Sequence, residues 1–439
     1  MKKSKNHDFW ELVIPIFLNN LFISIMGSVD VFLLSAYSDD AVAATGIVGR
    51  VIYILTMLFE IIGVGATILL AQNLGADRKR EAKQLVGTAI FISVVQGLIL
   101  GFLILAVSEN ILNLLNVDNK IYDDALIYLK YMGVTLIFRS ITSVLSGTLR
   151  CYGYAKSGMA YTIIGNIVNI LGDYLVIFGK INLFNNVIEG VAFFTLLGYA
   201  ICGVLYFIKA IMCNLIKFRI NTDYMKEIYK VGIPQIMEGA SYNLSQFFIT
   251  YIISRLGWEY VSAQVYAMNI MGIISRFSYS TGETTGIMIG KLVGARKDTQ
   301  AFAVCKKNAL IAEKITLALT LLCIPIMHNI LGALTDNSYI MHIALVFVYF
   351  ECFTLIAKTI NFVYGNALKA SGDIYYAPII GMIFMWSIGT LGAYLLGIVA
   401  GFGVIGICAM FMLDESIRSL LLLRRWKNSK WLNKRLIVD

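Results

Sequence analysis

The sequence has little charge and few prolines for its length. Only 14% of its 439 residues are Asp, Glu, Lys or Arg, whereas 58% are hydrophobic. A soluble protein of this size needs far more charged surface, so the composition excludes that class and predicts a polytopic membrane protein. The presence of only 4 prolines beside 37 glycines favours long helices with close contacts over loop-rich domains.

Cysteine and histidine are too scattered to form a metal site or a disulfide framework. The 7 cysteines include no CxxC pair, and the 3 histidines form no ligand cluster. The sequence also lacks P-loop, HExxH and GxSxG motifs. We therefore expect a protein that is not an enzyme, has no cofactor and draws its energy from an ion gradient. The net charge of +9 is concentrated in particular loops, so it does not indicate nucleic acid binding.

Twelve apolar segments are long enough to cross a bilayer as helices, which takes about 20 residues for a ~30 Å core. They cover residues 10–36, 44–72, 84–107, 122–146, 158–179, 186–212, 231–256, 261–290, 305–327, 338–364, 374–398 and 401–423. The first is too long for the apolar core of a signal peptide, so we interpret it as a retained span. The sequence thus predicts an all-α membrane protein with twelve transmembrane helices.

Basic residues occupy every second loop between these segments. Lys and Arg gather at positions 2, 3 and 5, at 78–83, 150–156, 217–230, 291–307 and 369, and at 424–435. The opposite loops hold mainly Asp and Glu. By the positive-inside rule, this alternation predicts that both termini lie in the cytoplasm. We expect the protein in the inner (cytoplasmic) cell membrane.

The two halves of the sequence repeat each other at an offset of 219 residues. Four pairs of features follow in order: Pro15 and Pro234, Gly63 and Gly282, Leu74-Gly75-Ala76 and Val293-Gly294-Ala295, and Leu149-Arg150-x-x-Gly153 and Leu368-Lys369-x-x-Gly372. This pattern predicts a duplication with six-helix lobes at 1–219 and 220–439. The lobes should be related by a pseudo-two-fold axis along the membrane normal, as in many transporters. A duplicated bundle without a transport role is the alternative.

Polar residues interrupt two of the apolar segments. Asn166, Asn169 and Asp173 are spaced i, i+3, i+7, so they share one face of a helix. Asp30 lies alone in the first segment, and both carboxylates lie at a similar depth, roughly 9 Å below the outer end of their helices. An Asp at mid-helix costs roughly 2.5–3.5 kcal/mol on insertion scales, so these side chains should face protein or water.

The chemistry of these polar side chains indicates an ion site. Oxygen ligands of this kind suit a small hard cation such as Na⁺, and a poorly solvated carboxylate can instead carry a proton. We therefore predict a cation-coupling site with Asp30, Asn169 and Asp173 as candidate Na⁺ ligands. The positions 219 residues later are Ile249 and Gly392, so the second half lacks this pair of carboxylates. The alternative is that each Asp only bonds a neighbouring amide or backbone group.

Other residues inside the predicted helices have less certain roles. Asn166, Glu238 and Glu351 are candidate residues of a cation or substrate site, although pairing across helices explains the two charges equally well. Pro15 lies near the start of the first helix. It is either an N-terminal helix residue or the mark of a bend where a backbone donor is missing.

Together these features resemble the multidrug and toxic compound extrusion (MATE) family over essentially the whole chain. The motifs that carry the resemblance are Ile14-Pro15 with Asp30, Leu74-Gly75-Ala76, Gly147-Thr148-Leu149-Arg150-x-x-Gly153, Asn166-x-x-Asn169-x-x-x-Asp173, Phe194-Thr195, Gly232-Ile233-Pro234, Gly294-Ala295 and Leu368-Lys369-x-x-Gly372-Asp373. The resemblance implies a secondary antiporter that exports cationic amphipathic compounds in exchange for Na⁺ or H⁺. The two lobes would rock between outward-open and inward-open states, and we expect the chain to act as a monomer.

The resemblance also implies roles for single residues. The ion site of one branch of the family maps onto Asp30, Asn169, Asp173 and Thr195, and its bending proline maps onto Pro15. Another branch has its site on acidic residues of the seventh and tenth helices. Those helices hold Glu238 and Glu351 here, but the nearby Lys358 departs from that pattern.

Two alternatives stay open at this point. One is a lipid-linked oligosaccharide flippase of the wider superfamily, which the count of twelve spans and the mixture of acids and bases in the candidate cavity disfavour. The other is a membrane-embedded acyl or glycosyl transferase. That reading needs a catalytic His, Cys or carboxylate cluster, and the sequence shows none.

Overall fold

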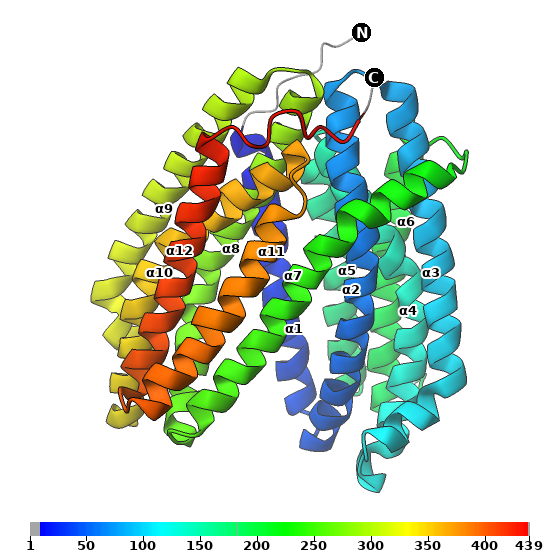
Figure 1. Cartoon of the computed structure of the whole chain (residues 1–439). Helices are drawn as coiled ribbons and strands as arrows, with labels where there is room; N and C mark the ends of the chain where they lie inside the picture. Colours follow the sequence, from blue (N-terminus) through cyan, green and yellow to red (C-terminus); the bar gives the residue numbers. More distant parts are fainter. Residues whose placement is uncertain (1–8, 182, 438–439) are drawn as a thin grey trace. The chain divides into compact units, whose positions relative to one another are not determined.

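The computed structural model describes residues 9–181 and 183–437, which form long helices joined by short loops (Figure 1). The helices are α1 (Phe9–Ser35), α2 (Asp39–Gly75), α3 (Lys79–Leu114), α4 (Asn119–Cys151), α5 (Ala155–Ile177), α6 (Val187–Met212), α7 (Thr222–Ser254), α8 (Trp258–Gly294), α9 (Asp298–Gly332), α10 (Ser338–Ser371), α11 (Tyr376–Phe384) and α12 (Gly403–Lys427). α11 continues into two π-helical stretches, η1 (Met385–Gly392) and η2 (Leu395–Val399). The prediction of an all-α fold with twelve helices is confirmed.

Nine helical segments in the described part of the chain are long and apolar enough to cross a membrane. α7, α8 and α12 do not meet that measure, and they carry charged side chains along their length, among them Glu238, Arg276 and Asp414. The helices also extend past the predicted spans. α2 and α8 have 37 residues each, which is about 55 Å of helix against a core of about 30 Å.

Side-chain caps and one glycine set several helix ends. The Asp118 side chain accepts a hydrogen bond from the backbone of Lys120 at the start of α4, and Asn186 accepts one from the Glu189 backbone at the start of α6. These are ordinary N-caps that satisfy otherwise unpaired amides. α10 ends at Gly372, whose φ of 106° lies in the left-handed region that glycine adopts without strain.

The described residues fall into two compact units. The first contains residues up to 70 and 78–233, and the second contains 71–77 and 234 onwards. The first unit therefore holds α1, most of α2, α3 to α6 and the start of α7, and the last turn of α2 belongs to the second unit. The lobe boundary at 219/220 stays a prediction. The basic residues 2, 3 and 5 lie outside the described residues.

Each unit has its own apolar core. In the first, Val48 and Phe59 of α2 pack with Leu112 of α3 and Leu129 of α4. In the second, one core cluster joins α8, α9, α10 and α12, and another joins α8, α9 and α10. Because helices are packed on several sides, polar groups inside a unit are withdrawn from both lipid and bulk water.

Candidate functional site

The polar stripe of α5 faces α6, and its side chains are joined by hydrogen bonds. The Asn169 amide nitrogen donates to Asp173 Oδ2 at 3.2 Å and to Thr195 Oγ1 of α6 at 3.2 Å. Thr195 in turn donates to the backbone carbonyl of Val191 at 2.9 Å. Asp173 is 1% exposed and Asn169 is 7% exposed. The structure thus brings three of the predicted site residues together inside the first unit.

Small residues make this contact between α5 and α6 possible. A Cβ atom on Gly165 would lie 2.6 Å from the Gly198 carbonyl oxygen, and one on Gly198 would lie 2.6 Å from the Gly165 carbonyl oxygen. Further along α5, Gly172 lies directly against the ring of Phe194. Only glycine allows two backbones to approach this closely. The crossing therefore sets the spacing between Asn169 and Thr195.

Asp30 adds a second carboxylate from α1, which packs against α5. The two acids are near enough that the charge of Asp30 acts on Asp173. Within the described residues, Oδ1 of Asp30 and Oδ1 of Asp173 are both buried and accept no hydrogen bond, and neither carboxylate pairs with a lysine or arginine. Buried carboxylate oxygens without a partner are costly, and a bound cation or a proton would relieve that cost.

Further polar side chains lie close to this site. The Asn166 amide nitrogen, one turn before Asn169, is buried without an acceptor among the described residues. Tyr128 of α4 interacts with Thr195 and lies within electrostatic reach of Asp30 and Asp173. Sequence reasoning missed Tyr128, because it sits among other tyrosines of α4 and no spacing singles it out. The guanidinium of Arg139 lies over the ring of Tyr199, 4.5 Å from its centroid.

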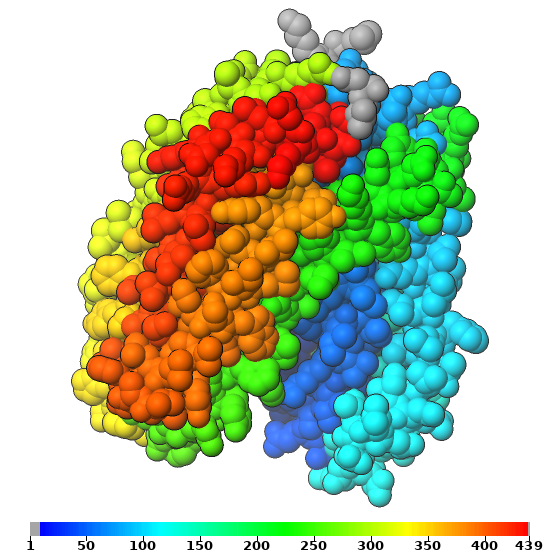
Figure 2. Space-filling view, viewed as in Figure 1, coloured from blue at the N-terminus to red at the C-terminus, as the bar shows by residue number. Residues whose placement is uncertain are grey.

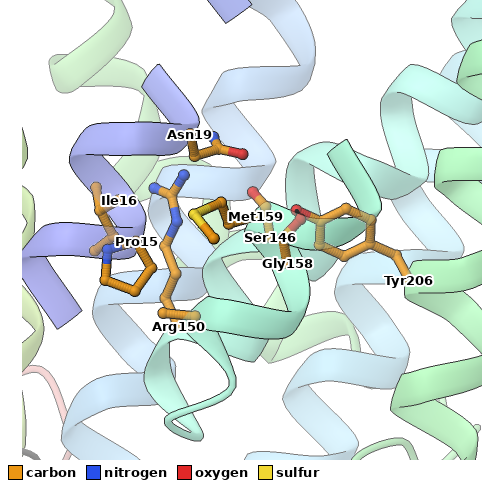
Figure 3. Close-up of a pocket in the computed structure, with 9 residues that line it drawn as sticks. Pro15, Ile16, Asn19, Ser146, Arg150, Gly158, Met159 and Tyr206 are labelled. Carbon is orange, nitrogen blue, oxygen red and sulfur yellow. Dashed lines mark hydrogen bonds between the residues drawn. The ribbon is translucent and has the colours of Figure 1, made fainter. Parts of the chain in front are cut away.

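Pro15 lies inside α1 and not in its first turn, and it lines a small pocket of the first unit (Figure 3). The pocket lies between α1, α4, α5 and α6, and Figure 3 shows the Arg150 side chain extending towards Asn19. The side-chain amide oxygen of Asn19 is buried and has no hydrogen-bond partner among the described residues. The pocket has room for about one water molecule, so it is too small for a drug-sized compound.

The acidic residues of the second unit have a different environment. Glu351 Oε1 lies 2.5 Å from Lys358 Nζ, and Glu238 Oε2 lies 2.7 Å from Lys369 Nζ. The structure therefore places these two candidates in separate ion pairs and does not join them into one site. At the positions equivalent to the two aspartates, Ile249 is buried in an apolar cluster and Gly392 lies in η1.

A second ion-paired group surrounds Arg418 of α12. This side chain donates two hydrogen bonds to Asp414, at 3.0 and 2.9 Å, and lies 2.6 Å from Glu415 Oε1. Asn361 of α10 donates to the other Glu415 oxygen at 2.6 Å. Each of these acids of α10 and α12 thus has a basic partner, and Asp414 and Glu415 share one, Arg418. In the described part of the chain, no group of three or more His, Cys, Asp or Glu side chains could hold a metal.

Comparison with known proteins agrees with this architecture. The family model MatE matches the chain twice, at residues 15–175 and 234–395, which supports the predicted duplication. The uncharacterized transporter YisQ of Bacillus subtilis is 30% identical over 437 residues, covering 98% of this chain and 96% of that protein. The probable multidrug resistance protein NorM of Thermotoga maritima is 24% identical over 435 residues, covering 96% of this chain and 92% of that protein.

Solved structures show the same fold. The outward-facing conformation of a multidrug resistance MATE family transporter of the MOP superfamily superposes with a TM-score of 0.88 at 17% identity. The superposition covers 99% of this chain and 100% of the chain of that transporter. Because the family model matches well over half of the sequence, the relationship extends beyond shape. The chain belongs to the MatE family of transporters.

Proposed function

We propose that the protein is a secondary antiporter that exports cationic amphipathic compounds in exchange for Na⁺ or H⁺. Members of its family are membrane transporters and not enzymes, so the alternative of an embedded transferase no longer applies. The observation that carries the proposal is the pair of buried carboxylate oxygens on Asp30 and Asp173. Both oxygens lack partners among the described residues, and the other oxygen of Asp173 accepts from Asn169, which also donates to Thr195.

The proposed site lies in the first unit alone. Its two carboxylates have no fixed cation at all, whereas in the second unit Lys358 and Arg418 offset two of the three negative charges of Glu351, Asp414 and Glu415. A coupling cation gains most where negative charge is not yet compensated. Coupling through the first unit is therefore favoured over a second site at Glu238 or Glu351.

Cation binding would change the role of Asn169. In this structure its amide nitrogen donates to Asp173 and Thr195. Turning the amide would instead present its carbonyl oxygen, which can bind Na⁺ beside the two carboxylates. If a proton is the coupling ion, one carboxyl takes it and becomes a hydrogen-bond donor. Each mode neutralises carboxylate charge that has no basic partner among the described residues.

Exchange follows if the cation and the compound favour different conformations. A cation that binds one state better shifts the equilibrium towards it, and a compound that binds the other state shifts it back. Pro15 inside α1 lacks the backbone donor of other residues, so α1 is the helix proposed to bend between states.

We further propose that both termini are cytoplasmic, because basic loops alternate with acidic ones along the chain. We also propose that the transporter is a monomer.

The test is drug efflux from proteoliposomes that carry either a Na⁺ gradient or a pH gradient alone. We expect a cationic dye to be accumulated or released under one of these gradients. The gradient that drives this movement identifies the coupling ion. Without efflux under either gradient, the antiport proposal fails. Movement of a lipid-linked oligosaccharide in the same vesicles would then support the flippase alternative.

A further inference from the structure

The chain after α12 turns away from the helix axis and packs against its own unit (Figures 1 and 2, red). We call residues 429–436 the latch segment. Residues 71–77, which are the last turn of α2 and the two residues after it, belong to the same compact unit as the latch segment, although residues 39–70 of that helix belong to the first unit. α2 is one continuous helix, so whatever holds its last turn also restrains the rest of it.

Gln72 connects the last turn of α2 to two other chain segments. Its side chain is fully buried. Its amide nitrogen donates to the Ala370 carbonyl near the end of α10 at 2.7 Å, and its amide oxygen accepts from the backbone nitrogen of Leu436 at 3.0 Å. A buried amide with both ends satisfied fixes the relative positions of the groups that it joins. Here it joins α2, α10 and the latch segment.

The same turn of α2 meets α8 with almost no side chains between the backbones. A Cβ atom added to Gly75 would overlap the backbone carbonyl oxygen of Lys291. One added to Gly294 would overlap the backbone carbonyl oxygen of Gln72. These glycines are the central residues of the repeated motifs 74–76 and 293–295. A contact made of backbone and glycine can separate and re-form without repacking of interlocked side chains.

The latch segment is anchored at one end and reaches α2 and α8 with the other. Near its start, the Trp431 ring stacks on Trp426 of α12 with 4.4 Å between centroids. Lys434 Nζ lies 2.6 Å from Asp373 Oδ1. At its far end, Arg435 Nε donates to the Val293 carbonyl of α8 at 2.9 Å. The aromatic anchor is buried, whereas the contacts to α8 and α2 are single hydrogen bonds.

We propose that the latch segment is a conformational device that holds the last turn of α2 against α8 and α10 in one state of the transport cycle and releases it in another. The proposal rests on the alternating access described above. If the two units move relative to each other, a helix that belongs to both must either bend or be released at its end. The far-end hydrogen bonds are the weakest part of this connection, so release begins at Arg435 and Leu436.

Hydrogen exchange of the purified full-length protein in nanodiscs tests the latch without any substrate. The variant Lys434→Gln/Arg435→Gln removes one ion pair and one donor. It should speed amide exchange in residues 71–77 and at Leu436 by about tenfold, because the protecting contacts then open more often. The matched control is Arg424→Gln/Lys427→Gln, which removes two positive charges from exposed side chains in the last turn of α12, outside the latch segment. Its exchange should equal that of the wild type.

A measurement of transport distinguishes a segment that acts in the transport cycle from one that only stabilises the fold. The variant Lys434→Gln/Arg435→Gln should change the rate of dye efflux at least about twofold, since a released α2 alters the balance between states. The control Arg424→Gln/Lys427→Gln should not change it. Unchanged exchange in 71–77, or faster exchange with an unchanged efflux rate, would overturn the proposal. If the wild type moves no dye under either gradient, the antiport proposal fails, and the exchange comparison still decides whether residues 429–436 hold α2.

Discussion

Gly165 of α5 and Gly198 of α6 cross so closely that a Cβ atom on either would lie 2.6 Å from the carbonyl oxygen of the other. The crossing lies one helical turn from Asn169 on one helix and from Thr195 on the other. The hydrogen bond between those two polar residues therefore depends on two residues that have no side chain.

Replacing Gly198 by valine should separate α5 from α6. Overpacking of this kind costs about 1–3 kcal/mol, and it should move Thr195 away from Asn169. We expect a folded protein with a lower melting temperature and greatly reduced ion-driven efflux, measured in proteoliposomes. Gly49→Val is the control, because a Cβ at Gly49 meets no atom within 4 Å. Wild-type efflux by Gly198→Val would show that the crossing does not position the site.

Neutralising either carboxylate of the site should abolish coupled efflux. Asp30→Asn and Asp173→Asn keep the shape of the side chain but remove the charge that attracts the cation. The wild type should gain thermal stability from its coupling cation, by about 2.7 kcal/mol at a concentration 100 times Kd. The two variants should show no such gain. Asp123→Asn, at an exposed position, should behave like the wild type, and full drug resistance in both site variants would contradict the assignment.

The Glu351–Lys358 pair of α10 should matter for stability and not for ion coupling. Lys358 is 9% exposed and Glu351 is partly buried, so Lys358→Met leaves Glu351 without its cation, at a cost below the roughly 3–5 kcal/mol of a fully buried pair. The double variant Glu351→Gln/Lys358→Met should regain much of that loss. Melting temperatures of the two single variants and the double variant measure this, and the double variant should still transport with the same ion. Loss of coupling in a stable double variant would place an ion site in the second unit.

Removing Pro15 should stiffen α1. Alanine restores the backbone donor that proline lacks, and the helix interior gains up to about 3 kcal/mol. We expect an equal or higher melting temperature and slower efflux in Pro15→Ala. Pro325 also lies inside a helix, in α9, so Pro325→Ala is the matched control and should leave the efflux rate unchanged. Faster or equal transport by Pro15→Ala would argue against α1 as the bending helix.

Much of the candidate site could be predicted because its signals are local. The spacing of Asn169 and Asp173 places them on one face of α5, and helix geometry alone puts Asp30 at a similar depth. Tyr128 could not be found this way, since it reaches Thr195 from α4 across a helix interface. The sequence also does not determine that Glu351 pairs with Lys358, because a charged side chain inside a helix bundle can pair with several neighbours and only the packing selects one.

The sequence by itself determined the membrane class, the twelve helices, the duplication and the residues that share a helix face. These follow from hydropathy, periodicity and repeats, which depend only on neighbours along the chain. The tertiary structure alone decided which carboxylate oxygens lack partners, which acids pair with Lys358 and Arg418, and that Gln72 joins α2 to residues 429–436. Those facts depend on close packing between segments far apart in sequence, where a difference of one ångström creates or removes a hydrogen bond.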